Sequence, residues 1–96
     1  MKAKNISDAK KFTDIANVGP AVEYDLVLLG FKKPMDLHGQ DPLILYKRLC
    51  KITKSNQDPC VLDVFMAVTD FANGAPPRPW YKYTVVRKKK YPLLRR

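Results

Sequence analysis

The sequence has 96 residues, 46% of them hydrophobic, which suits one compact domain and leaves too little chain for two. No apolar run approaches the roughly 18 residues of a membrane span and no signal peptide is visible, so we expect a cytoplasmic protein without a membrane partner. The net charge of +9 is uneven, because residues 1–74 are nearly neutral whereas residues 75–96 hold eight Lys or Arg and no acid. The sequence therefore predicts a domain over 1–74 and a basic C-terminal arm over 75–96.

The N-terminal part predicts two helices joined by a tight bend. Ser7 is a suitable N-cap for a helix over 7–16, and Asn17-Val18-Gly19 is too short for more than a turn. Pro20 follows, and a proline at the first position of a helix costs no hydrogen bond. The second helix then runs until Gly30 stops it, with an apolar face formed by Val22, Leu26 and Leu29.

Prolines mark the starts of three further helices. The prolines at 34, 42 and 59 each suit the first position of a helix, and the last two follow an aspartate, Asp41 or Asp58, that can cap it. A second tight bend lies at 38–41, between the first two of these starts. The additional helices are predicted over 34–38, 42–53 and 59–73, which makes five in all.

The helix over 59–73 is apolar almost all round, so we expect it at the centre of the core or, alternatively, against a second subunit. Leu62 and Met66 on its second apolar side are the candidate contacts of a homodimer. After Gly74 the run Ala-Pro-Pro-Arg-Pro cannot be helical. We therefore expect an extended arm from residue 75, with Trp80 docked on the domain and the cations at 87–90 and 95–96 mobile.

The first bend resembles the hairpin of the helix-hairpin-helix motif, in which a hydrophobic residue lies between two small turn residues. In that family the backbone N–H groups of the hairpin bind nucleic-acid phosphate without reading sequence, and amides at the positive end of a helix dipole suit an anion. This chain departs from the pattern at Asn17, which replaces a glycine, at Pro20, which removes a donor, and at Glu23, whose charge disfavours phosphate.

Six blocks of sequence carry a more specific resemblance: Asn17-Val-Gly-Pro, Leu29-Gly-Phe, Asp36-Leu-His-Gly-Gln-Asp-Pro42, Tyr46-Lys-Arg-Leu-Cys50, Cys60-Val-Leu-Asp-Val-Phe65 and Pro79-Trp80. Over residues 12–81 they resemble the small helix-hairpin-helix family named for a pathogenicity locus or for mitomycin resistance. The resemblance implies an all-α domain of five short helices, in which the bend at 38–41 and its helices form a second, degenerate copy of the motif. A more distant resemblance, to the C-terminal domain of competence-regulator proteins, implies that the motif serves protein contacts instead.

The predicted function is non-enzymatic, sequence-nonspecific binding of nucleic acid, with duplex DNA as the expected partner. Hairpin amides and a basic arm would contact phosphates, giving weak and salt-sensitive affinity. The alternative is a protein-interaction module whose hairpins no longer bind phosphate. The candidate nucleic-acid-binding residues are Val18, Gly19, Ala21 and Val22 in the first hairpin, Gly39 and Gln40 in the second, the neighbouring Lys32 and Lys33, and Arg87, Lys88, Lys89 and Lys90 in the arm.

Cofactors, metals and catalytic groups are not predicted. His38, Cys50 and Cys60 lack the close Cys/His pairs that a structural zinc ion requires. The two cysteines are too few for a disulfide framework, and we expect free thiols. Asp63 and Asp70 are too far apart on their helix, about 10 Å, to share a proton, and no nucleophile–base signature is present.

Overall fold

The computed structural model describes residues 2–92 and 94, and all regular secondary structure in that part of the chain is helical. The α-helices are α1 (Pro20–Leu28), α2 (Pro42–Thr53), α3 (Pro59–Ala72) and α4 (Thr84–Lys90). Four short 3₁₀ turns accompany them: η1 (Ile6–Asp8), η2 (Phe12–Asp14), η3 (Pro34–Leu37) and η4 (Trp80–Tyr83). The predicted all-α class is confirmed. None of the helices in the described part is long and apolar enough to cross a membrane.

Three predicted helices form where their prolines place them, namely α1, α2 and α3. The side chains of Asp41 and Asp58 cap α2 and α3, each accepting a 2.9 Å hydrogen bond from the backbone N–H two residues on. Gly30 follows α1 with φ 95°, and the N–H of Phe31 donates to the carbonyl of Leu26 at 3.1 Å, which is the predicted helix stop.

The segments 7–16 and 34–38 do not form the α-helices predicted for them. The predicted arrangement of five helices is therefore not the one observed. The first is replaced by η1 and η2, and the second is the single turn η3. Asn5, rather than Ser7, caps the first turn, because its Oδ1 accepts the N–H of Asp8 at 3.2 Å. After η2 and η3 the backbone becomes extended at Ile15 and His38, so neither turn can propagate.

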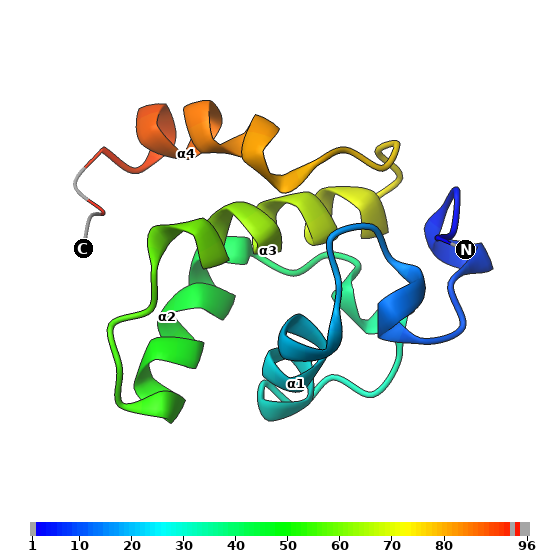
Figure 1. Cartoon of the computed structure of the whole chain (residues 1–96), viewed down its shortest axis with the longest axis horizontal. Helices are drawn as coiled ribbons and strands as arrows, with labels where there is room; N and C mark the ends of the chain where they lie inside the picture. The colour runs from blue at the N-terminus through cyan, green and yellow to red at the C-terminus, as the bar shows by residue number, and fades with distance from the viewer. Residues whose placement is uncertain (1, 93, 95–96) are drawn as a thin grey trace.

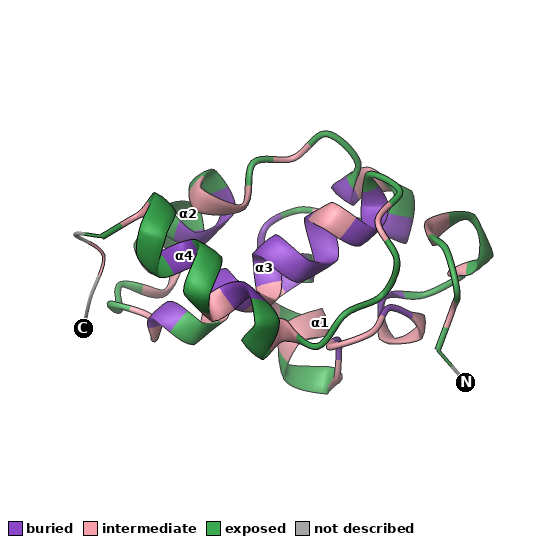
Figure 2. Ribbon diagram, turned by 90° about the horizontal axis from the view of Figure 1, so that it is seen from above, coloured by how far each residue is buried: buried purple, intermediate pink, exposed green. Residues whose placement is uncertain are grey.

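Helix α3 is the central element of the fold, as predicted. In Figure 1, α4 lies above α3, while α1 and α2 lie below it. Most of α3 is buried in Figure 2, whereas most of α4 is exposed. The core joins α3 to the N-terminal turns and to α1 and α2, and its fully buried members include Ile15, Leu26, Leu37, Leu45, Leu49, Leu62, Phe65 and Val68.

The predicted extended C-terminal arm is corrected by the structure. Residues 75–79 lack regular structure, but the chain then forms η4 and α4, which pack along α3. The homodimer contact predicted at Leu62 and Met66 is also wrong, because both side chains are buried within the monomer, at 0% and 8% exposure. The prediction of mobility fails for 87–90, which belong to α4, and for Arg95 and Arg96 it lies outside the described residues.

Candidate nucleic-acid interface

The two predicted bends have the same backbone structure. In each, the aspartate at the third position of a 3₁₀ turn, Asp14 or Asp36, accepts hydrogen bonds of 2.9 to 3.1 Å from the N–H groups of the two lysines before the turn. Three residues later the backbone is left-handed, with φ 75° at Asn17 and 77° at Gly39. A helix begins at a proline in both cases. The segments 10–23 and 32–45 are therefore structural repeats.

The capping aspartates have lowered pKa values. Hydrogen bonds from the backbone N–H groups of Lys10 and Lys11 stabilise the ionised carboxylate of Asp14 and lower its pKa below the ordinary 3.8. The N–H groups of Lys32 and Lys33 lower the pKa of Asp36 in the same way. The charged form of each aspartate therefore favours the folded state.

Replacing Asp36 with asparagine should consequently reduce stability at neutral pH and matter less in acid. A carboxyl with a depressed native pKa contributes its stability above the unfolded-state pKa and loses it as pH falls through the native value. Urea unfolding of the parent and Asp36→Asn at neutral and acid pH measures this difference, and Asp14→Asn should behave alike. A difference in stability that stays constant across this pH range would contradict the assignment.

Both bends are hydrogen-bonded to the segment between the end of α3 and the start of η4. The Asn17 side chain donates from Nδ2 to the carbonyl of Arg78 at 2.8 Å and accepts the N–H of Trp80 on Oδ1 at 3.1 Å. In the second bend, the N–H of Gly39 donates to Oδ1 of Asn73 at 2.8 Å. The Asn17 side chain therefore makes contacts that a glycine at this position would lack.

Three of the predicted hairpin donors are used inside the protein. The N–H of Val18 donates to Ile15 at 3.1 Å, that of Gln40 donates to Leu37 at 3.2 Å, and Gly39 is bound as above. Val18 is also only 1% exposed. The remaining predicted donors, Gly19, Ala21 and Val22, lie at the start of α1, where the opening N–H groups have no partner within the helix.

The basic residues of α4 divide into one buried cation and three exposed ones. Arg87 Nε lies 2.6 Å from Oδ1 of Asp63, and the two side chains are 8% and 0% exposed. The hydroxyl of Thr84 donates to the other oxygen of Asp63 at 2.8 Å. Arg87 is therefore withdrawn from the predicted binding residues, because it anchors α4 to α3 instead of facing solvent.

The lysines predicted to bind nucleic acid lie on opposite sides of α3. Lys88, Lys89 and Lys90 are exposed on α4. Lys32 and Lys33 are exposed on the connector after α1, which runs below α3 in Figure 1, whereas α4 lies above it. The predicted residues are thus not gathered into one patch, and α4 carries the densest cluster. Sequence reasoning missed the contacts of Asp63, because its partners Thr84 and Arg87 lie 21 and 24 residues further along the chain.

Comparison with known proteins places this arrangement in a family. The pathogenicity-locus family Cdd1 matches residues 5–89. The chain belongs to this family. A mitomycin resistance protein, McrB of Streptomyces lavendulae, is 37% identical over 83 residues, which cover 86% of this chain and 79% of that protein. No solved structure matches. The Cdd1 match includes both bends and α4 as far as Lys89, so the basic helix is part of the family's domain.

In residues 2–92 and 94, no three His, Cys, Asp or Glu side chains are arranged to hold a metal ion. Cys50 and Cys60 are free thiols, the first half-buried and the second exposed. The described surface also carries exposed lysines, a type of side chain that can form charge-assisted hydrogen bonds with anions.

Proposed function

We propose that this protein binds nucleic acid without sequence preference, through phosphate contacts made chiefly by the lysines of α4. The observation that carries the proposal is a basic helix held in place on the core, in a part of the sequence, residues 75–96, that contains no acid. Each exposed lysine can neutralise one phosphate, and such contacts give nonspecific dissociation constants on the order of 10⁻⁴ to 10⁻⁶ M.

Anchoring makes α4 better suited to this role than a free tail. Because Arg87 and Thr84 bind Asp63, the backbone of α4 is ordered before any ligand arrives. Only the side chains of Lys88, Lys89 and Lys90 then lose freedom on binding, which reduces the entropic cost of association.

The repeated bends support a tandem helix-hairpin-helix interpretation of the domain, in which the motif is mainly structural. Their left-handed residues and proline starts match between the two copies, but three of the six predicted amides serve internal contacts. The start of α1, with the N–H groups of Gly19 and Ala21, is the part of the motif that supports an added phosphate contact.

Replacing Lys88 and Lys89 together with glutamine is expected to weaken binding to a labelled duplex of arbitrary sequence. Each lost phosphate contact lowers the slope of log affinity against log salt by about 0.9, so the slope should fall by about 2. Fluorescence anisotropy at several salt concentrations measures it. The matched control replaces Lys10 and Lys11 with glutamine. These two exposed lysines directly precede η2, and their replacement should change the slope less.

A Gly19→Glu variant tests the first hairpin separately. Gly19 has φ −104°, which any residue adopts, and a Cβ placed there meets no atom within 4 Å, so the variant should fold. If this variant alone weakens duplex binding and the α4 variant does not, the hairpin binds and the assignment to α4 is wrong. If no binding is seen even at low salt, the proposed function fails.

A protein-interaction module is the second candidate. It is favoured by the internal use of three hairpin amides and by the apolar side chains that α1 presents to solvent, Tyr24 at 65% and Val27 at 57% exposure. Residues three apart on a helix lie on the same face, so these two form one patch. Protein interaction becomes the better-supported function if duplex and single-stranded nucleic acid both fail to bind at low salt.

A further inference from the structure

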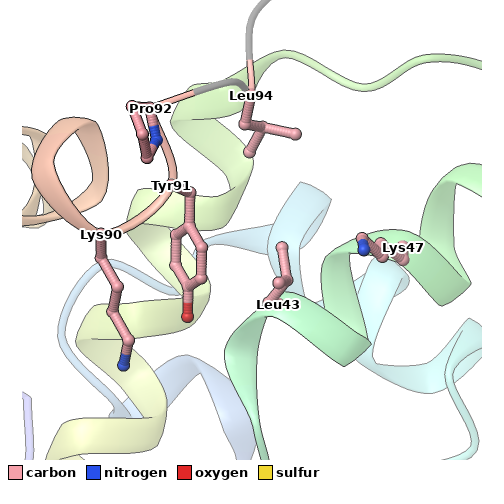
Figure 3. A pocket seen from close by; sticks show the side chains of 6 residues that line it. All are labelled: Leu43, Lys47, Lys90, Tyr91, Pro92 and Leu94. Carbon is pink, nitrogen blue, oxygen red and sulfur yellow. The ribbon is translucent and has the colours of Figure 1, made fainter.

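A pocket of about 380 Å³ lies where the end of α4 meets the start of α2. Its volume falls within the roughly 300–1,000 Å³ of small-molecule sites. Figure 3 shows the Tyr91 ring between Lys90 on one side and Leu43 with Lys47 on the other. The lining residues are Leu43, Lys47, Lys90, Tyr91, Pro92 and Leu94.

The pocket combines an apolar interior with cations from two helices. Leu43, Tyr91 and Leu94 supply the apolar walls, and Tyr91 is half-buried and packed against the core. The exposed lysines are Lys47 from α2 and Lys90 from α4, and none of the described residues that line the pocket is acidic. The Lys90 ammonium lies 5.6 Å from the centroid of the Tyr91 ring. The matching occupant has a flat apolar group and an anionic group attached to it.

A nucleobase with its adjoining phosphates has this chemistry. Bases stack on aromatic side chains in a sequence-tolerant manner, while nearby cations bind the backbone. The pocket also continues the row of exposed lysines on α4, since Lys90 belongs to both. In a duplex the base faces are covered by neighbouring base pairs, so only an unpaired base can enter.

We propose that this pocket receives one unpaired base against Tyr91, with Lys47 and Lys90 on the flanking phosphates, and that the protein prefers single-stranded nucleic acid. This inference rests on the proposed function and specifies its substrate. The duplex then binds through α4 lysines alone, whereas a single strand gains the additional stacking contact.

The test compares a labelled short oligothymidylate with a labelled duplex by anisotropy in the full chain. Tyr91→Leu keeps an apolar side chain but removes the ring, and it should weaken single-strand binding about 10-fold, as loss of one stacked base does. Duplex affinity should not change. Tyr91→Phe should retain single-strand binding, and Tyr24→Leu is the matched control, because Tyr24 is an exposed tyrosine of α1 that does not line the pocket.

A second variant tests the pocket without altering its apolar packing. Lys47→Gln changes only an exposed side chain, and should weaken single-strand binding more than duplex binding. Equal affinity for both nucleic acids, unchanged in Tyr91→Leu and Lys47→Gln, overturns the inference. The proposed function survives that result if replacing Lys88 and Lys89 still lowers duplex affinity, and absence of all binding at low salt overturns both.

Discussion

Replacing Asp63 with alanine is expected to lower the free energy of unfolding by about 3–5 kcal/mol, the usual cost of removing one partner of a buried ion pair. Asp63 is fully buried, and its two oxygens bind Arg87 and Thr84 at 2.6 and 2.8 Å. The variant leaves the guanidinium buried without its counter-ion. The protein can relieve this only by releasing α4 into water, so loss of stability and loss of the docked helix should occur together.

Urea unfolding followed by circular dichroism measures the change in stability. The decisive control replaces Asp63 with leucine, Arg87 with methionine and Thr84 with valine in the same chain. Exchanging a buried ion pair for apolar side chains of similar volume is often neutral or stabilising, so most of the stability should return. A loss in Asp63→Ala below about 1 kcal/mol, the range of an exposed pair, would show that α4 is not held by a buried contact.

The second large effect is expected from Asn17→Ala, at about 3–4 kcal/mol. Two side-chain hydrogen bonds, to Arg78 and Trp80, are worth about 1 kcal/mol each, and the left-handed backbone costs a residue with a Cβ roughly 1–2 kcal/mol. Asparagine tolerates this conformation better than alanine does. The change should also loosen residues 78–80, and the single tryptophan, Trp80, reports this by its fluorescence.

The second bend provides the matched control. Gly39 has nearly the same φ, 77°, and a Cβ there meets no atom within 4 Å, so Gly39→Ala isolates the backbone cost. Asn17→Gly isolates the side-chain contribution instead. Glycine can adopt the left-handed backbone, so this variant loses only the two side-chain hydrogen bonds. The losses in these two variants should sum approximately to that of Asn17→Ala. If the Asn17→Gly variant were as stable as the parent, the hydrogen bonds of the Asn17 side chain to Arg78 and Trp80 would not stabilise the fold.

The sequence predicted α1, α2 and α3 because their signals are local. A proline at the first helical position and a capping aspartate lie within two residues of the groups they affect. The stop at Gly30 is equally local, since a left-handed residue ends α1 wherever the rest of the chain lies. The apolar character of 59–73 likewise indicated that α3 is buried, either at the centre of the core or against a second subunit.

The predictions failed where the outcome depends on residues distant in sequence. The segment that forms α4 contains two β-branched valines and a run of like charges, which do not favour an isolated helix. It folds on α3 because Asp63 offers Arg87 a counter-ion across 24 positions of sequence. Leu62 and Met66, which an isolated view of α3 left open for a second subunit, are buried within the folded monomer.

At the two bends, local sequence determines some features and contacts between distant residues determine others. Their sequence alone determined that the chain turns at 17–19 and 38–41 and begins a helix at the following proline, because backbone preference acts over a few residues. Only the tertiary structure decided what the bends are bound to and which lysines face solvent. Those features arise from contacts between distant segments, such as Asn17 with Trp80 and Asp63 with Arg87, whose pairing leaves no periodic signal in the sequence.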